Sequence, residues 1–414
     1  MTISRRALLG ATAAGAIMPV ITAPWAPAAR AATSVVRIGV LNDQSGPYRD
    51  VSGLNSVVCV KQAIQDFGAA NKGLTVEVLS ADHQNKPDVG AGIARQWFDR
   101  DGVDMIIDVP TSSVGLAVAS VCREKNRAYI NVGAGTAELT GAQCAATTIH
   151  WAYDTWMLAH STGGATVKAG GDTWYFLTAD YVFGHDLDRE TSGFVTAAGG
   201  KVLGHSTYPF PSTTDFSSFL LQAQATGAKV LGLANAGADT VNSIKQAHEF
   251  GLTGKTRIAA LLMFITDVHA LGLATAQGLV LTESFYWNMN EKTRAFAMRI
   301  KEKTPNNMPN MVQAGCYAGT IHYLKAIADM GVAAAKASGA AAIARMKAMP
   351  TEDDAFGTCH IREDGRVLVP AYLFEVKTPA ESKEPWDYYK LLVTTPGNEA
   401  FRPLADGHCP LVHA

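Results

Sequence analysis

The chain has 414 residues, of which 48% are apolar and 17% charged, so it can bury more than one sizeable hydrophobic core. Its formal net charge is −2 at pH 7, and the sequence contains no long basic run. This balance excludes a protein that binds nucleic acid mainly through the phosphate backbone. A chain of this length and composition is expected to form two globular lobes.

The first residues have the anatomy of an export signal. Arg5 and Arg6 precede an apolar, helix-prone run over residues 7–22, and a small-x-small motif ends at Ala31. This order predicts a twin-arginine-like signal peptide over residues 1–31, cleaved near Ala31, and a mature protein in the periplasm. The alternative is an N-terminal membrane anchor, but prolines interrupt a run that is already short for spanning hydrocarbon.

After this segment, short apolar runs alternate with segments of helical periodicity. Strands are predicted over residues 35–41, 74–80, 103–109 and 127–132, with helices near residues 60–67, 87–99 and 112–125. Strands that are separated by helices of this length form a parallel, doubly wound sheet.

The same alternation then starts again and predicts a second lobe. Strands are expected over residues 173–179, 201–207, 229–235, 256–262 and 278–284, with helices near residues 184–198, 216–226 and 238–251. A helical block near residues 292–348 and short strands at 366–376 and 386–393 follow, and they are expected to complete both lobes.

The predicted fold is therefore α/β, with two doubly wound Rossmann-like lobes joined by a hinge of several crossovers. The expected boundaries are residues 34–152 with 285–365 for the first lobe, and residues 153–284 with 366–410 for the second. Ligands of open α/β sheets bind beyond the carboxyl ends of the strands, which here face the cleft between the lobes.

The six cysteines contain no C-x-x-C pair, which argues against a zinc ribbon or a redox motif. Cys59, Cys122 and Cys316 occur in apolar helical patterns, where a buried free thiol is expected. Cys144 and Cys409 occur in polar, loop-like sequence and are the favoured disulfide pair, although the sequence leaves the connectivity open.

A glycine-rich loop, NVGAGTAELTG, follows the fourth predicted strand. A dinucleotide fingerprint needs G-x-G-x-x-G after the first strand, whereas here Gly133 and Gly135 have no third partner. The P-loop, zinc-protease and nucleophile-elbow motifs are absent from the sequence, and the histidines lack metal-ligand spacing. We therefore predict a protein that is not an enzyme and that has no cofactor or metal site.

Hydroxyl groups follow two of the predicted strands. The third strand ends before Thr111, Ser112 and Ser113, at a helix start whose free N–H groups and dipole favour an anion. The fourth ends at Ala134 and Thr136, which add a hydroxyl and exposed amides. Together these ends are able to hold a carboxylate without a charged residue, although helix N-capping explains the serines equally well.

These features together resemble a known family. The export signal, the two lobes, SGPY at 45–48, TSS at 111–113, GAGTAELTG at 133–141, YDTWMLA at 153–159 and ADYVFGHDL at 179–187 are similar to the solute-binding proteins of branched-chain amino acid ABC transporters. The resemblance extends over residues 34–410 and implies the type I periplasmic binding protein fold. It also implies a membrane permease as partner and a monomeric receptor.

The resemblance further implies which residues bind the ligand. They come from the strand-end loops of both lobes: Ser112 or Ser113, Ala134 and Thr136 from the first, and Tyr181 or Phe183, Asn235 and Ala236 from the second. Family members that bind amino acids also pair a glutamate with the ammonium group. Here that segment reads ALLMFITD, with Met263 and Phe264 near the expected acid.

An ammonium group that is desolvated without a counter-charge costs several kcal/mol. The preferred ligand is therefore a small carboxylate with an apolar or aromatic body. Aromatic residues at predicted strand ends fit a flat ligand, although core packing explains each of them singly: Tyr48, Tyr153, Tyr181, Phe183, Phe264 and Phe285-Tyr286-Trp287.

Two alternatives stay open. One is an amino-acid receptor whose counter-charge comes from Asp43, Asp267 or Glu283, and the other is a sensor that presents the ligand to a signalling partner. The acids of the ADYVFGHDL segment and the helix after it, Asp180, Asp186 and Asp188, are interpreted as a solvated loop and helix start.

Overall fold

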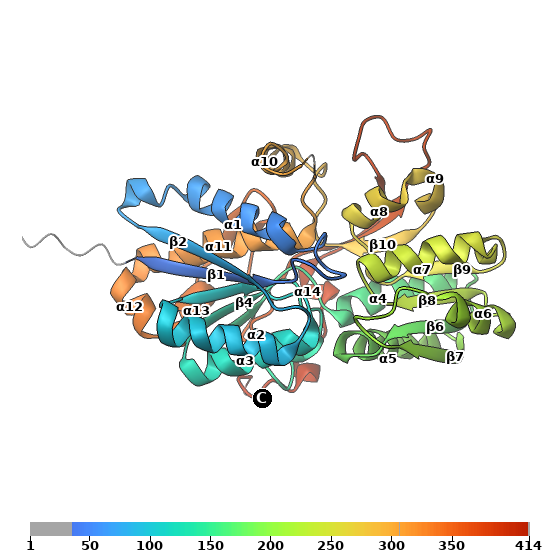
Figure 1. The fold of residues 1–414 in the computed structure, drawn as a ribbon, viewed down its shortest axis with the longest axis horizontal. Helices are drawn as coiled ribbons and strands as arrows, with labels where there is room; N and C mark the ends of the chain where they lie inside the picture. Colours follow the sequence, from blue (N-terminus) through green and yellow to red (C-terminus); the bar gives the residue numbers. More distant parts are fainter. Residues whose placement is uncertain (1–34, 306, 413–414) are drawn as a thin grey trace, which may run out of the picture. The chain divides into compact units, whose positions relative to one another are not determined.

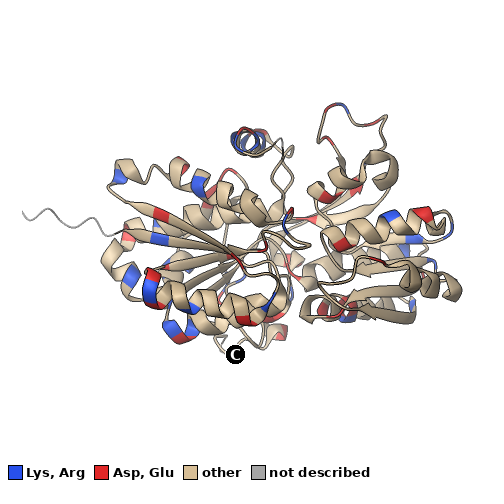
Figure 2. Cartoon of the chain, in the orientation of Figure 1, with Lys and Arg blue, Asp and Glu red and all other residues tan. Residues whose placement is uncertain are grey.

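The computed structural model describes residues 35–305 and 307–412, which belong to one compact unit. The predicted signal peptide over residues 1–31 lies outside the described residues. Within the described ranges, no helix combines the length and the apolar character that a membrane span requires. Basic and acidic residues are interspersed along the outer helices (Figure 2), in keeping with the small net charge.

The first sheet has five parallel strands in the order β2-β1-β3-β4-β5. Its strands β1, β2 and β4 are labelled in Figure 1. Its strands are β1 (Val36–Asn42), β2 (Val76–Asp82), β3 (Met105–Asp108), β4 (Ala128–Asn131) and β5 (Thr148–His150). The helices from this part of the chain are α1 (Gly53–Phe67), α2 (Pro87–Gln96) and α3 (Ser112–Lys125), with the short η1 (Ala70–Lys72), η2 (Trp97–Asp101) and η3 (Ala137–Thr140).

Both faces of the inner strands β3 and β4 of the first sheet are buried, which explains why these strands are mostly apolar. Along β3, Met105 and Ile107 pack in the core that contains the buried side chains of α1. Ile106 points to the other face and packs with Val114 and Val118 of α3. Because successive side chains of a strand alternate between faces, a strand covered on both sides has no polar face.

The second sheet has seven strands in the order β14-β13-β10-β9-β8-β6-β7. Five are parallel, namely β6 (Thr173–Ala179), β7 (Lys201–Tyr208), β8 (Val230–Ala234), β9 (Arg257–Ala260) and β10 (Val280–Glu283), and two are antiparallel, β13 (Ala371–Val376) and β14 (Tyr389–Thr395). Its helices are α4 (Thr155–Lys168), α5 (Val182–Ala197), α6 (Ser217–Thr226), α7 (Ala238–Glu249), α8 (Ile265–Leu271) and α9 (Leu273–Ala276), with η4 (Leu252–Gly254).

The C-terminal part of the chain contributes to both sheets. Its helical block packs on the first sheet through α11 (Met311–Met330) and α13 (Gly339–Lys347), which contact β3 and β4. The other elements are α10 (Glu291–Lys301), α12 (Val332–Ala337), the hairpin β11 (Thr351–Asp353) and β12 (Gly357–Cys359), α14 (Gly397–Ala400) and η5 (Leu404–Gly407). The predicted fold class, two α/β lobes with parallel sheets, is confirmed, while the lobe boundaries given above stay a prediction.

The chain crosses between the sheets after β5, after β10 and before β13. Arg366, in the third crossover, has no exposed surface, and its Nη1 donates to the carbonyls of Trp151 (2.8 Å) and Tyr153 (3.4 Å) in the first crossover. Its Nη2 lies 3.5 Å from the Asp154 carboxylate, and the ring of Phe401 stacks on its guanidinium group. One buried cation therefore ties together two crossovers and the C-terminal segment.

The C-terminal segment also returns to the first lobe. A disulfide joins Cys409 to Cys144, the pair that the sequence favours, and Arg402 donates to the carbonyl of Ala137 at 3.1 Å. The three cysteines that the sequence places in helices are buried and free. The segment thus braces the loop that follows Thr136.

Candidate functional site

The end of β3 has an unusual backbone. Asp108 and Val109 are buried and adopt positive φ angles of 89° and 58°. Such a φ is a steric outlier for the β-branched valine, and strain of this kind is typical of functional sites. Thr111 precedes α3, but its side chain donates to Asn85 rather than capping the helix. The first N–H groups of α3 therefore have no side-chain cap.

The two hydroxyl-bearing strand ends meet in the structure. The Thr136 backbone N–H donates to Ser112 Oγ at 3.1 Å, and both residues are fully buried. Ala134 lies beside them, with its N–H donating to the Asn131 side chain at 3.2 Å. Ser113 is half-buried at the second position of α3. The structure thus brings together the four first-lobe residues that the resemblance implies.

A small cavity lies next to these loops, with walls from both lobes. Its volume is about 10 Å³, and its lining residues are Tyr48, Val51, Pro110, Gly133, Tyr153, Tyr181, Phe183, Ala236, Leu262 and Phe264. Six of these ten are candidates from the sequence: Tyr48, Tyr153, Tyr181, Phe183, Ala236 and Phe264. The space suffices for about one water molecule. An aromatic acid enters only if the lobes separate or the rings rotate.

Aromatic contacts hold the two walls of the cavity together. The hydroxyl oxygens of Tyr48, from the first lobe, and Tyr181, from the second, are 2.5 Å apart. Both rings stack on Phe210, with centroid distances of 5.4 and 4.4 Å. Sequence reasoning missed Phe210, which lies two residues after the end of β7. These three rings therefore form a contact between the two lobes at the cavity.

The SGPY loop closes against the start of α7. The Ala238 N–H donates to the Pro47 carbonyl at 3.0 Å. Gly237, with φ 60°, lies so close that a Cβ there would be 2.6 Å from the same oxygen. A glycine is therefore required for this approach of the two lobes.

Asp186 was also missed by sequence reasoning. The interpretation of the acids as solvated is wrong for Asp186 and Asp188, which are buried. Asp186 Oδ2 accepts a hydrogen bond of 2.6 Å from the Thr136 hydroxyl, across the two lobes. Its position three residues after Phe183 on α5 was the available signal, because residues so spaced share a helix face.

Residues 35–383 match the family model described as periplasmic binding protein. The chain belongs to the periplasmic binding protein family. A periplasmic binding protein from Burkholderia mallei is 48% identical, with 91% of this chain and 99% of that chain covered and a TM-score of 0.86. The predicted family is confirmed.

Two further structures are similar to this periplasmic binding protein. A branched chain amino acid ABC transporter periplasmic ligand-binding protein from Burkholderia xenovorans LB400 is 36% identical, covering 91% of this chain and 99% of that chain, with a TM-score of 0.78. A solute-binding protein of an ABC transporter from R. palustris, in complex with benzoate, is 18% identical over 87% and 97% of the chains, with a TM-score of 0.77. The last likeness shows the fold alone.

The sequence offers three acids as counter-charges for an amino-acid ligand. In the structure, all three accept hydrogen bonds from other groups of the protein. Asp43 accepts hydrogen bonds from the SGPY loop, including the Tyr48 N–H at 2.8 Å. Asp267 accepts from the Phe264 N–H at 2.9 Å, at the start of α8. Glu283 accepts from three donors described below. None of the three lines the cavity.

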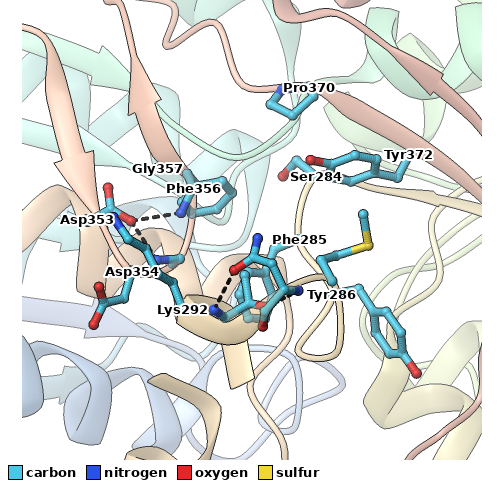
Figure 3. A pocket seen from close by; sticks show the side chains of 14 residues that line it. Ser284, Phe285, Tyr286, Lys292, Asp353, Asp354, Phe356, Gly357, Pro370 and Tyr372 are labelled. Atoms are coloured by element: carbon cyan, nitrogen blue, oxygen red, sulfur yellow. Dashed lines mark hydrogen bonds between the residues drawn. The ribbon is translucent and has the colours of Figure 1, made fainter. Parts of the chain in front are cut away.

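Seven of the residues predicted to bind ligand do not line the cavity: the four at the strand ends described above, and Asn235, Met263 and Tyr286. Asn235 is buried and bonds to Thr240 at 2.8 Å, and Met263 is buried in the core. Tyr286 lines a separate pocket of about 90 Å³ between the second crossover, the β11–β12 hairpin and β13 (Figure 3). Among the described residues, no group of three or more His, Cys, Asp or Glu side chains could hold a metal ion.

Glu283 makes the stability of the binding protein depend on pH. Its carboxyl accepts hydrogen bonds from the Tyr389 hydroxyl (2.7 Å) and the Ile265 and Met311 N–H groups (3.1 and 3.4 Å). Burial nevertheless raises its pKa to about 8, whereas an unfolded glutamate titrates near pH 4.3. Between pH 4.3 and 8 the folded state binds a proton that the unfolded state has lost. The stabilisation from this proton is complete below about pH 4.3 and is lost as the pH rises through 8.

We expect the free energy of unfolding to fall between pH 5 and 8, with Glu283 contributing up to about 1.4 kcal/mol per pH unit. In Glu283→Gln the decline should be shallower, because the amide does not titrate. Urea denaturation at several pH values measures this slope. The exposed Glu291→Gln is the control, and equal slopes in wild type and Glu283→Gln would contradict the assignment.

Proposed function

We propose that this protein is an extracytoplasmic receptor of an ABC importer. It binds a small carboxylate with an apolar or aromatic body between its two lobes and delivers it to a membrane permease. The observation that carries the proposal is the cavity wall: aromatic residues of both lobes surround it, and no acidic side chain lines it. Membership of the periplasmic binding protein family supports the role in solute binding.

We infer that the ligand carboxylate binds at the start of α3. There Ser112 has a hydroxyl proton to donate, since its oxygen accepts from Thr136, and the first N–H groups of α3 have no side-chain cap. A helix N-terminus favours an anion through these groups and the helix dipole. The rings of Phe183 and Phe264 cover the apolar body. Contacts from both lobes exist only when the cleft is shut, so ligand binding selects the closed state.

A branched-chain amino acid receptor is the second candidate. The 36% identity to the Burkholderia xenovorans protein, which is described as a branched chain amino acid ABC transporter component, favours it. This alternative needs an acid for the ammonium group, and Asp43, Asp267 and Glu283 do not line the cavity. A sensor that presents the same ligand to a signalling partner would use the same cleft.

The remaining proposals concern the mature protein. We propose export by the twin-arginine-like signal with cleavage near Ala31, and a monomer whose Cys144–Cys409 bond forms in the oxidising periplasm. A periplasmic location is supported by the family match. The role of receptor, without catalysis, rests on the same match.

Thermal denaturation with a ligand panel tests the function. Benzoates and cinnamates at a hundred times their Kd are expected to stabilise the protein by about 2.7 kcal/mol, because they bind only the folded state. Leucine and valine at the same concentrations form the comparison arm. Stabilisation by leucine alone would support the second candidate, and stabilisation by neither class would contradict both.

A further inference from the structure

A second cavity lies in the second lobe, outside the cleft. Its volume is about 310 Å³, and its walls come from α4 with its C-cap and from the segments of β9, β10, β13 and β14. None of its lining residues lines the cleft cavity. Binding sites for small molecules have volumes of about 300–1,000 Å³. This cavity, called the groove below, is therefore large enough for a small ligand.

Small side chains on α4 leave the space of the groove open. The helix wall consists of residues at positions i, i+3, i+4 and i+7, which share one helix face: Thr162, Ala165, Thr166 and Ala169. On the sheet, Val280 lies opposite both Ala259 and Glu375 in the strand register, so these three side chains share the other wall. Alanine and threonine do not reach far enough from α4 to fill the gap to the sheet.

The groove extends across four neighbouring strands in the order β14-β13-β10-β9. Arg257 lies at one side, on β9, and Leu392 at the other, on the edge strand β14. Neighbouring strands are about 4.8 Å apart, so roughly 14 Å separates these two residues. Leu392 is 44% exposed and offers apolar surface to a ligand. Since none of the described residues that line the groove is aromatic, its walls fit an extended aliphatic chain better than a flat ring.

Arg257 gives one side of the groove an unpaired positive charge. Its side chain is exposed and forms no ion pair within residues 35–305 and 307–412. Glu375 is the acidic residue that lines the groove, and its carboxylate already pairs with Lys390 at 2.7 Å. The charge that is left for a ligand is therefore positive, and it favours an anionic head group.

We propose that the groove is a second binding site, which takes a linear aliphatic carboxylate. The carboxylate pairs with Arg257, and the chain lies along the small residues of α4 toward Leu392. This site is independent of the proposed function, because the groove and the cleft cavity share no lining residue.

A series of acids tests the site by calorimetry on the purified chain. From hexanoate through heptanoate to octanoate, all below the concentrations at which they form micelles, the affinity should rise about fourfold with each methylene group that is buried. Octylammonium should bind at least threefold more weakly than octanoate at low salt, because its head group is repelled by Arg257. Equal Kd values along the series, or tighter binding of octylammonium, would contradict the proposal.

Two variants assign the binding to the groove. Ala165→Trp fills the space beside α4 at an exposed helical position, and it should weaken octanoate binding at least tenfold. Its control is Ala295→Trp, at an exposed position of α10 outside the groove. Arg257→Gln should weaken octanoate binding about threefold to fivefold, as expected for an exposed ion pair, and leave octan-1-ol unaffected. The matched control Arg294→Gln, also at an exposed position, should bind octanoate like the wild type.

The variants also separate this site from the cleft, which is proposed to take carboxylates as well. If the wild type binds octanoate and both groove variants keep its Kd, octanoate occupies the cleft, so the groove is not a site and the proposed function gains support. If no aliphatic acid binds, the groove proposal is wrong, while the panel of benzoates still decides the proposed function. Melting temperatures of the variants check their folding, and Arg257→Gln alone decides the matter if Ala165→Trp does not fold.

Discussion

Replacing Arg366 with methionine is expected to lower the free energy of unfolding by about 3–5 kcal/mol. The guanidinium group is fully buried and faces the Asp154 carboxylate at 3.5 Å, and burial lowers the pKa of Arg366 to about 10. Removing the cation leaves the 2% exposed Asp154 buried without a counter-charge, and it also removes the donor to the carbonyls of Trp151 and Tyr153. Both changes remove interactions at the crossovers that connect the lobes.

Urea denaturation followed by circular dichroism measures the change. Arg345→Met is the control, because Arg345 forms a half-exposed pair with Asp329 and such surface pairs contribute at most about 1 kcal/mol. The double variant Arg366→Met/Asp154→Asn should recover part of the loss, since asparagine removes the uncompensated charge and still caps α4. A loss below about 1 kcal/mol in Arg366→Met would mean that the buried pair does not hold the crossovers.

The strands of both sheets were predictable because of how they are buried. The apolar run at 103–109 contains β3 (Met105–Asp108), and the run at 173–179 is β6 (Thr173–Ala179). Helices cover both faces of these strands, so most of their positions are apolar. The same reasoning missed β5 (Thr148–His150) and the β11–β12 hairpin, because strands of three residues are too short for a periodic signal.

The candidate site was predictable only in part, for a different physical reason. Strand ends of a parallel sheet meet at one edge, so Ser112 and Thr136 could be expected to lie together, and they do. Phe210 and Asp186 instead make contacts between the lobes, and local sequence shows only that Asp186 shares a helix face with Phe183. Tyr286 lies just after a strand, as the sequence predicts. The chain turns there, however, so Tyr286 lines the separate pocket beside the second crossover.

A valine at Gly135 is expected to raise the ligand Kd roughly 100-fold. In the closed cleft a Cβ at this position lies 2.9 Å from ring carbons of Phe183, on the opposite lobe, and 3.0 Å from the Tyr153 ring. Overpacking of this kind costs about 1–3 kcal/mol, which corresponds to roughly 5–150-fold in affinity. Valine adds two further methyl groups, so the upper part of this range is expected.

The cost falls on the closed state, because the lobes move apart on opening and the contact with Phe183 is relieved. The melting temperature without ligand should therefore stay within about 2 °C of the wild type, while calorimetry with the most stabilising acid of the panel shows the loss of affinity. Gly164→Val is the matched control, since a Cβ at this position of α4 has nothing within 4 Å. An unchanged Kd in Gly135→Val would mean that ligand binding does not bring Gly135 and Phe183 together. A large fall in the melting temperature without ligand would mean that the valine clashes with Tyr153 in the hinge, and not only with Phe183 when the cleft closes.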